Sequence, residues 1–397
     1  MNIKNDPVIV AAARTAVGKA KRGGLASARP EDLMATVIKD LLKKVKPLNP
    51  EQLDDLIVGC AFPEGEQGMN ISRMISFRAG LPVSVPSETI NRFCSSGLQS
   101  ISHAAFAIMA GQIQVAIAGG VESMSMVPMT GYKFAPNPFL AENYPEAFTS
   151  MGITAENVAQ KYGVSREDQD IFSLHSHQKA TEAVQSGRFD PEIVPIEVEV
   201  VEVGKNGKPE SKSITIKRDE GPRADTSLEA LGRLRSAFKE GGSVTAGNSS
   251  QMSDGAAGVM IMSRSMAEDL GLQPIARFVS FGVAGVPPEI MGIGPIKAVP
   301  KALKIANLTM DDIGLIELNE AFAAQGIAVM RELNFVEEIT NVNGGPIAHG
   351  HPLGATGEKL TTQLLYEMQR RDVIYGMVTM CVGGGMGAAG IFENLAS

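Results

Sequence analysis

The chain has 397 residues, of which 44% are hydrophobic and 20% are charged, a balance typical of a globular protein with two or three domains. The formal net charge of −8 argues against a protein that binds nucleic acid or a membrane surface through basic patches. Three cysteines in a chain of this length suggest neither a disulfide framework nor a spaced set of metal ligands, so we expect a reducing, cytoplasmic setting. We also expect no secretory signal and no membrane-spanning helix, because the N-terminus runs directly into an apolar, strand-like segment and no uncharged stretch is long enough.

The first 120 residues alternate between predicted strands and helices. Pro30 suits the first turn of a helix, and the apolar residues that follow it recur at intervals of three and four as far as Val45. Apolar runs without this period are typical of buried strands, and their alternation with helices predicts parallel sheets covered by helices. The expected strands are 8–13, 56–58 and 115–118, and the expected helices begin at Pro30 and at about residue 95, the second ending near residue 110.

The middle of the chain, residues 121–249, follows a different pattern and is predicted to be an inserted lobe. Its first part is rich in Met, Pro and Phe and lacks a helical period, as in a long ordered loop. A Ser-x-x-Asp capping pattern then predicts a helix, and an alternating segment around an Asn-Gly dipeptide predicts a β-hairpin. These three features cover residues 124–150, Ser165 and Asp168 to about Gly187, and residues 196–216 around Asn206-Gly207.

The two ends of the chain resemble each other. In both, an Asp-Asp pair precedes a short apolar strand and an Ala-Phe pair, and a later strand ends in a glycine-rich turn. This echo, between 54–62 and 311–322 and between 114–122 and 375–387, predicts a duplicated α/β unit. We therefore divide the chain into an N-terminal core of residues 1–120, completed by about 250–272, the lobe 121–249, and a C-terminal core of residues 273–397.

Cys94 is the first candidate nucleophile. A strand-like segment precedes it and an apolar helix follows, so its sulfur is expected at a helix N-terminus, where free N–H groups lower the pKa of a thiol. The alternative is a small buried hydrophobic residue, which is what we expect of Cys60. The residues around Cys94 leave both interpretations open.

Three further segments carry candidate chemistry. Cys381 precedes a run of glycines that can expose N–H groups to an oxyanion, although it could also be a packed strand end. A dinucleotide-binding loop is rejected there, because too little chain follows to form the required helix and strand. His351 lies in a glycine-rich segment and could bind an oxyanion or take a proton from a thiol, or could be an ordinary turn histidine. Asn319 and Glu320 follow an apolar strand, where α/β proteins place ligands, unless Asn319 caps a helix.

These signals are much more specific in combination than alone. Segments 119–125 and 151–157 are similar to thiolases, and the resemblance extends from the first strand of the chain to the last. In chain order, the segments that resemble the four active-site loops of the thiolase family are Cys94-Ser95-Ser96, Asn319-Glu320-Ala321-Phe322, Gly350-His351-Pro352 and Cys381-Val382-Gly383.

The resemblance implies a thiolase-like α/β fold with two duplicated βαβαβαββ halves, a layered α/β/α/β/α core and an inserted loop domain. It also implies that Cys94 is the acylated nucleophile, and that His351 takes its proton and then holds the thioester oxyanion together with Asn319, which acts through a water. Cys381 would be the acid/base, and the backbone N–H groups of Cys94 and Gly383 would form a second oxyanion hole. The positions that match CoA contacts in the family are Arg223, Phe238, Ser250 and Met291.

Two thiolase activities fit these residues. One is the cleavage of 3-ketoacyl-CoA by CoA into acetyl-CoA and a shortened acyl-CoA, as in fatty acid β-oxidation. The other is the biosynthetic acetyl-CoA C-acetyltransferase reaction, in which two acetyl-CoA condense to acetoacetyl-CoA. The short loop 127–150 and Ser150, where biosynthetic thiolases typically carry a histidine, favour the degradative activity.

Two other classes are disfavoured. Cys381 argues against a ketoacyl-ACP synthase, and the four intact loops argue against a non-catalytic, thiolase-like lipid-binding protein. The partners implied by the resemblance are acyl-CoA and CoA, in a homodimer or homotetramer. CoA is a substrate, so neither a cofactor nor a metal is expected, and we expect no nucleic acid partner and no membrane insertion.

Overall fold

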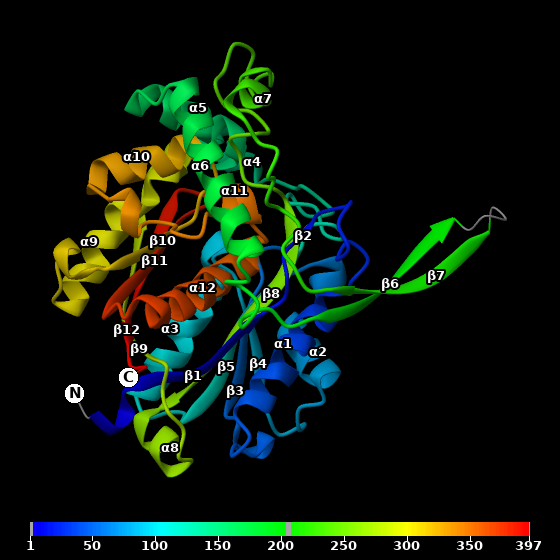
Figure 1. The fold of residues 1–397 in the computed structure, drawn as a ribbon, viewed down its shortest axis with the longest axis vertical. Coiled ribbons are helices and arrows are strands. Elements are labelled where there is room, and N and C mark those ends of the chain that lie inside the picture. The colour runs from blue at the N-terminus through cyan, green and yellow to red at the C-terminus, as the bar shows by residue number, and fades with distance from the viewer. Residues whose placement is uncertain (1–2, 204–207, 397) are drawn as a thin grey trace.

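The computed structural model describes residues 3–203 and 208–396, which form a layered α/β protein (Figure 1). As predicted, strands and helices alternate at the start of the chain, and the first α-helix begins at Pro30. The strand before Gly119-Gly120 continues through both glycines. Position 120 requires glycine, because a Cβ there would lie 2.4 Å from the Gly354 carbonyl oxygen. The elements of this part are β1 (Pro7–Arg14), β2 (Gly18–Lys19), α1 (Pro30–Lys44), β3 (Asp55–Gly59), α2 (Ile71–Ala79), β4 (Ser87–Ile90), α3 (Ser96–Met109) and β5 (Val115–Ser123).

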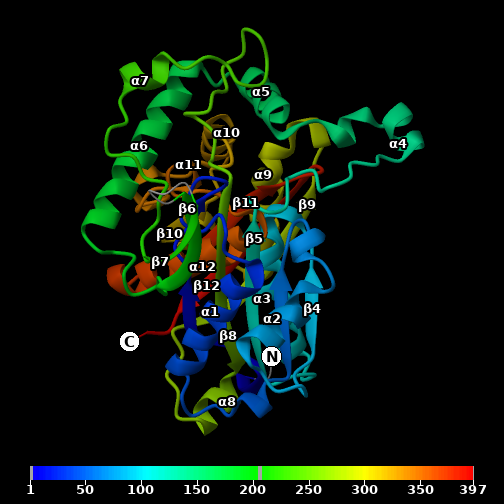
Figure 2. The same ribbon diagram turned by 90° about the vertical axis from the view of Figure 1, so that its right-hand side faces the viewer.

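The segment predicted as one long loop, residues 124–150, also contains helix, so that prediction was wrong in part. The Asn137 side chain accepts hydrogen bonds from the N–H groups of Phe139 and Leu140 and caps α4 (Pro138–Asn143), and a 3₁₀ helix follows at Pro145–Phe148. The helix is too short to show a helical period. Figure 2 shows α4 on an arm that projects from the body, and its aromatic side chains, such as Phe139 and Tyr144, are exposed.

The rest of the middle segment follows the predicted pattern. The predicted capping box is present, with Ser165 and Asp168 bonding to each other's backbone N–H groups at the start of a long helix. The predicted hairpin pairs Ile196 with Ile216, whereas its Asn206-Gly207 turn lies outside the described residues. The elements are α5 (Met151–Tyr162), α6 (Arg166–Gln185), β6 (Ile196–Val203), β7 (Pro209–Ile216) and α7 (Leu228–Gly232).

The C-terminal part again alternates strands and helices. Asn319 does not cap a helix, because the strand before it ends at Leu318 and the next α-helix has Phe322 as its N-cap residue. The elements are β8 (Ser253–Ser263), α8 (Arg264–Asp269), β9 (Ala276–Gly285), α9 (Gly294–Ala306), β10 (Leu315–Leu318), α10 (Ala323–Leu333), α11 (Pro346–His349), α12 (Thr356–Arg371), β11 (Tyr375–Val382) and β12 (Met386–Asn394).

The large sheet has two halves of the same design, as the internal echo predicted. Its strands lie in the order β10-β11-β12-β9-β1-β8-β5-β3-β4, and β2 pairs with β8 beside this path. In one half β3 is parallel to β5, and β5, β8 and β1 are successively antiparallel. In the other half β10 is parallel to β11, and β11, β12 and β9 are successively antiparallel. A short β1–β9 pairing at Val8 and Ile9 joins the halves.

Helices α3 and α12 pack against each other at the centre of the molecule (Figure 1). Helix α3 packs on β3 and β5, α12 packs on β10 and β11, α1 and α2 contact the N-terminal half, and α9 contacts the C-terminal half, which gives the layers α/β/α/β/α. The two central helices approach closely at glycines, since a Cβ on Gly97 would lie 2.8 Å from the Glu358 nitrogen and one on Gly357 would lie 2.3 Å from the Leu98 nitrogen. Their N-terminal ends, which follow Cys94 and His351, are therefore neighbours.

None of the helices in the described part of the chain has both the length and the apolar composition that a membrane crossing requires.

Candidate active site

Cys94 lies in a strained turn between β4 and α3. Phe93, directly before it, has a φ of +41°, a left-handed conformation that is costly for an aromatic residue. Two side chains hold this turn: Asn91 Oδ1 accepts a hydrogen bond from the Phe93 N–H at 2.8 Å, and the Ser96 hydroxyl donates to the Phe93 carbonyl at 2.7 Å. The chain thereby forms a 3₁₀ turn at Phe93–Ser95 before α3 begins, so Cys94 precedes the helix, close to where the sequence placed it.

The structure brings the two candidate cysteines together. The 3₁₀ turn of Cys94 packs against both β11, which carries Cys381, and the 3₁₀ turn Leu353–Ala355, which follows His351. Around Cys94 lie Ala61, Met124 and Leu353, and a separate apolar cluster surrounds Cys381. Two thiols, carried by different elements, thus lie in neighbouring parts of one site.

The predicted low pKa of Cys94 is contradicted by the structure. Burial raises the pKa of the Cys94 thiol to about 11, although the backbone N–H groups of Gly383 and of Cys94 itself face the sulfur and lower it. The negative charge of Glu122 raises this pKa further. Loss of water around the sulfur outweighs the start of the helix, so Cys94 is a neutral thiol at rest and needs a base to become nucleophilic.

Cys381 is also protonated at rest. Burial raises the pKa of its thiol well above the ordinary value, and the nearby Cys94 raises it further. Because two neighbouring thiolates would repel each other, ionisation of one thiol disfavours ionisation of the other. All three cysteines of the chain are free.

His351 has a defined tautomer. Its Nδ1 lies 2.6 Å from the Thr356 hydroxyl oxygen, and that hydroxyl donates its own hydrogen to the Pro352 carbonyl at 2.9 Å. The hydroxyl must therefore accept a hydrogen bond from Nδ1–H, which leaves the lone pair on Nε2. Burial lowers the pKa of His351 to about 3, and the positive charge of Lys359 lowers it further, so the imidazole is neutral at neutral pH and offers Nε2 as a base.

Asn319 lies beside this lone pair. Its Nδ2 is 3.4 Å from His351 Nε2, within reach for the amide to donate a hydrogen bond. Its Oδ1 is buried and accepts no hydrogen bond from the residues that the structure describes, so this oxygen is available to a donor such as water. Asn319 and His351 can therefore act on the same bound oxygen atom.

Residues 248–253 position both candidate side chains. The Ser250 N–H donates to the Ala321 carbonyl at 2.9 Å, in the loop of Asn319. The His351 N–H donates to the Gln251 carbonyl at 3.1 Å and to the Ser253 hydroxyl at 3.2 Å. This crossing segment joins the loop of Asn319 to the loop of His351 by main-chain bonds.

Thr356, the hydrogen-bond partner of His351, was not singled out in the sequence. We expect replacement of Thr356 by valine to lower kcat roughly 100-fold or more, because His351 then loses the partner that fixes its tautomer. Steady-state kinetics of Thr356→Val and Thr356→Ser test this, since serine keeps the hydroxyl and should restore most of the rate. Thr361→Val is the matched control, because the Thr361 hydroxyl donates to the Gly357 carbonyl in the same helix without meeting His351. Equal rates in Thr356→Val and the wild type would contradict the assignment.

The four predicted CoA-contact residues lie along one path of contacting residues. Arg223 lines a cavity of about 230 Å³ together with Ser249 and Gln251, which flank Ser250. From Ser250 the path continues through the main-chain bond to Ala321 and then to Phe322. Phe238, which is 43% exposed, packs edge-on against Phe322 with ring centroids 6.0 Å apart, and Met291 belongs to the buried cluster of Phe322 and Cys381. The path leads from an exposed cation to the thiol of Cys381.

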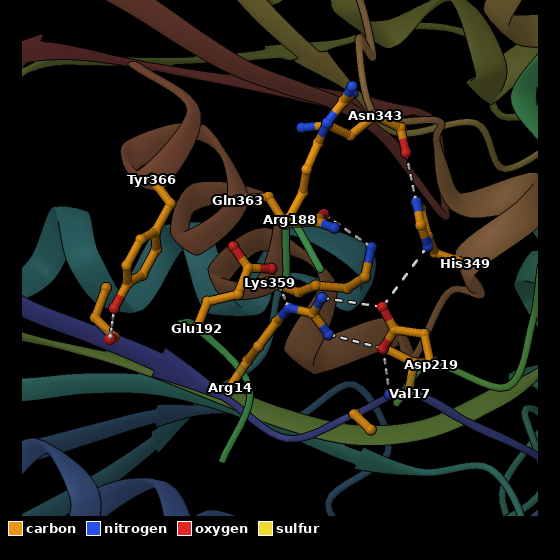
Figure 3. Close-up of polar contacts among 12 residues, drawn as sticks. Arg14, Val17, Arg188, Glu192, Asp219, Asn343, His349, Lys359, Gln363 and Tyr366 are labelled. Atoms are coloured by element: carbon orange, nitrogen blue, oxygen red, sulfur yellow. Dashed lines mark hydrogen bonds and ion pairs between the residues drawn. The ribbon is translucent and has the colours of Figure 1, made fainter. Parts of the chain in front are cut away.

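A buried network of charges surrounds His349, two residues before His351 in the chain (Figure 3). Asp219 accepts hydrogen bonds from the Arg14 guanidinium at 2.8 and 2.9 Å and from the Val17 N–H at 2.8 Å, and it lies 3.7 Å from His349 Nδ1. Arg14 also pairs with Glu192 at 2.6 Å. The network connects β1 and the middle segment to α11, the helix that ends two residues before His351. Arg14, Glu192 and Asp219 were not singled out in the sequence, because their partners lie far away along the chain.

The described residues contain no group of three His, Cys, Asp or Glu side chains arranged to hold a metal ion.

Comparison with known proteins agrees with this geometry. A model of the thiolase N-terminal domain matches residues 7–265, and a model of the thiolase C-terminal domain matches residues 272–394. The 3-ketoacyl-CoA thiolase of Bacillus subtilis is 58% identical over 388 residues, which cover 98% of this chain and 99% of that protein. The peroxisomal 3-ketoacyl-CoA thiolase 1 of Arabidopsis thaliana is 46% identical over 394 residues, which cover 98% of this chain and 88% of that protein.

Solved structures show the same fold. The Bacillus anthracis acetyl-CoA acetyltransferase superposes with a TM-score of 0.90 at 39% identity, over 100% of both chains. The dimeric peroxisomal thiolase of Saccharomyces cerevisiae superposes with a TM-score of 0.88 at 36% identity, over 99% of this chain and 98% of that chain. With both family domains matched, four active-site loops in one place and these relatives over nearly its whole length, the chain belongs to the thiolase family.

Proposed function

We propose that this protein is a 3-ketoacyl-CoA thiolase that cleaves its substrate with CoA through an acyl-enzyme on Cys94. The observation that carries the proposal is the convergence of a neutral thiol, a neutral histidine with its lone pair on Nε2, and a second thiol at one site. The relatives of Bacillus subtilis and Arabidopsis thaliana that bear the name 3-ketoacyl-CoA thiolase support the same reaction.

The first half-reaction uses His351 and Cys94 together. His351 Nε2 takes the proton of the Cys94 thiol, and the thiolate attacks the 3-keto carbon of the substrate. The N–H groups of Cys94 and Gly383, which face the sulfur, are suited to stabilise the oxyanion on that carbon. Breaking the bond between C2 and C3 leaves an acyl group on Cys94 and an enolate of acetyl-CoA.

The enolate needs a stabilising site and a proton. The His351 imidazolium and Asn319, through a water on its free Oδ1, would hold the thioester oxygen. The Cys381 thiol would then donate its proton to the enolate carbon and release acetyl-CoA. In the second half-reaction the Cys381 thiolate takes the proton of the incoming CoA thiol, and CoA attacks the acyl-enzyme to give the shortened acyl-CoA. The Cys94 thiolate that leaves takes back its proton from the His351 imidazolium, which restores the resting enzyme.

The biosynthetic condensation of two acetyl-CoA is the second candidate, favoured by the superposition on the Bacillus anthracis acetyl-CoA acetyltransferase. Steady-state thiolysis of 3-ketoacyl-CoA substrates from four to sixteen carbons separates the two candidates. We expect turnover to rise with chain length and to vanish in Cys94→Ala. Turnover of acetoacetyl-CoA alone would assign the biosynthetic reaction, and full activity in the variant would refute the Cys94 mechanism.

The proposal also covers the cellular location of the enzyme, its oligomeric state and the role of residues 121–249. We propose a cytoplasmic enzyme whose partners are acyl-CoA and CoA, with no cofactor and no metal, and in which residues 121–249 form a CoA-binding lobe between the cores 1–120 (with 250–272) and 273–397. We also propose a homodimer or homotetramer. The exposed aromatic residues Phe134, Phe139 and Tyr144 and the dimeric state of the Saccharomyces cerevisiae relative support this assembly. Light scattering that finds a monomer at micromolar concentration would count against the assembly.

A further inference from the structure

The mechanism above does not use Glu122, a buried carboxylate near the end of β5 that is 1% exposed. Its Oε2 accepts hydrogen bonds from the N–H groups of Ala61 and Gly354, both at 2.8 Å. Its Oε1 accepts from the Gln67 side-chain amide at 2.7 Å and from the Phe62 N–H at 3.3 Å. Burial raises the pKa of Glu122, whereas these four donors favour its ionised form. One carboxylate is thus held by donors from three separate segments.

The segments that Glu122 joins are the ones that enclose the reacting pair. Gly354 follows His351 by three residues and precedes Thr356, the partner of the imidazole. Ala61 belongs to the apolar cluster that contains Cys94, as does Leu353, the neighbour of Gly354. The contact is tight, because a Cβ on Gly354 would lie 2.8 Å from both Glu122 Oε2 and the Ala61 nitrogen. Glu122 therefore links the histidine loop directly to the wall beside the cysteine, in addition to the bonds from residues 248–253.

Gln67 fixes the orientation of this carboxylate. Its amide oxygen accepts a hydrogen bond from the Ser123 N–H, and its amide nitrogen donates both to Glu122 and to the Phe62 carbonyl at 2.9 Å. The amide cannot flip without losing all three bonds. Glu122 and Gln67 form a closed polar unit in an apolar surrounding, where an unpaired donor is costly.

We propose that Glu122 is a positioning residue for the Cys94–His351 pair, whose carboxylate sets the spacing of the two loops and whose negative charge opposes formation of the Cys94 thiolate in the resting enzyme. The proposal rests on the proposed roles of Cys94 and His351. The charge lies beside the pocket of Cys94, because Glu122 bonds to the N–H groups of Ala61 and Gly354, and Ala61 shares the apolar cluster of Cys94. This placement agrees with the contribution of Glu122 to the high pKa of Cys94.

Two substitutions separate spacing from charge. Glu122→Gln keeps the size but turns an NH₂ group toward N–H donors, and we expect kcat to fall about 100-fold and the midpoint pH for alkylation of Cys94 by iodoacetamide to move down by about one unit. Glu122→Asp keeps the charge but shortens the reach, so kcat should fall while the alkylation midpoint stays near that of the wild type. Peptide mass mapping identifies the alkylated cysteine.

A control completes the test. Glu358→Gln makes the same acid-to-amide substitution at another fully buried carboxyl, which is bonded to Ser100 and whose raised pKa favours the neutral acid, and it should leave kcat within about twofold. Thermal melting of each variant shows whether it is folded. If Glu122→Gln is unfolded, kcat and the alkylation midpoint of Glu122→Asp test the proposal instead.

The proposal would be overturned by a Glu122→Gln enzyme with wild-type kcat and an unmoved alkylation midpoint, or by a Glu358→Gln enzyme with an equal loss. The same holds for a Glu122→Asp enzyme with wild-type kcat. Failure of the proposed function is distinguishable, because it would appear as unchanged thiolysis in Cys94→Ala. Alkylation of Cys94 does not require turnover and would still report the charge of Glu122.

Discussion

Replacement of Cys94 by alanine is expected to lower kcat for thiolysis by roughly four orders of magnitude or more, because the covalent route then no longer exists. The remaining groups can still polarise the substrate, but without the Cys94 sulfur no acyl-enzyme forms. CoA then has no acyl group on the enzyme to attack. The expected change lies in kcat, since Cys94 is 8% exposed and adds little surface for binding CoA. Steady-state kinetics, together with mass spectrometry of the enzyme after mixing with substrate, check both consequences.

Cys60→Ala is the matched control for this prediction. Cys60 is buried like Cys94 and carries the same thiol, but it follows β3 and belongs to a different apolar cluster, where its Sγ lies 3.9 Å from Glu122 Oε1. We expect this variant to keep a wild-type acyl-enzyme signal and to lose some thermal stability through the small cavity that it leaves. An acyl adduct that persists in Cys94→Ala, or one that disappears in Cys60→Ala, would show that the nucleophile has been assigned to the wrong residue.

Replacement of Asp219 by asparagine is expected to lower the free energy of unfolding by about 3–5 kcal/mol. Asp219 is buried and bonds to the Arg14 guanidinium through both of its oxygens, and one of these oxygens also accepts the Val17 N–H (Figure 3). An amide keeps the shape, yet its NH₂ group must face Arg14 or Val17, and the guanidinium retains only Glu192 as a charged partner. Urea unfolding at pH 7 measures the difference from the wild type.

The same prediction has a pH dependence with a defined sign. Although burial raises the pKa of the Asp219 carboxyl, the nearby Arg14 guanidinium outweighs it and holds that pKa at about 2, below the ordinary value of 3.8. A carboxyl whose pKa is lower in the folded state contributes stability above its unfolded pKa and loses it as the pH falls through the folded value. The difference between the wild type and Asp219→Asn should therefore be full at pH 7 and shrink between about pH 4 and pH 2.

Asp312→Asn is the control for Asp219→Asn, because Asp312 is an exposed capping residue that bonds only locally to Thr309. We expect its unfolding midpoint to stay close to that of the wild type. If Asp219→Asn unfolds at the same urea concentration as this control, the buried network contributes nothing to stability. Loss of thiolase activity at full stability would instead show that the network acts on the loop of His351.

Local signals were sufficient for much of the fold. Pro30 with its apolar period predicted α1, and the Ser165–Asp168 capping box predicted the start of α6. These patterns act within one or two turns of chain, where backbone geometry and hydrogen-bonding capacity depend on neighbouring residues alone. The short α4 was not predicted, because a helix of six residues is too short to show a helical period. The Asn137 cap that begins α4 was overlooked among the prolines around it.

The sequence by itself determined which residue types are present at the site, and the order of Cys94, Asn319, His351 and Cys381 was enough to identify a resemblance to thiolases. Their protonation states were decided by the tertiary structure. The high pKa of Cys94 depends on loss of water and on Glu122, and the low pKa of His351 depends chiefly on burial. Burial and hydrogen bonds between segments far apart in the chain are properties of the packed molecule, and no local pattern of residues encodes them.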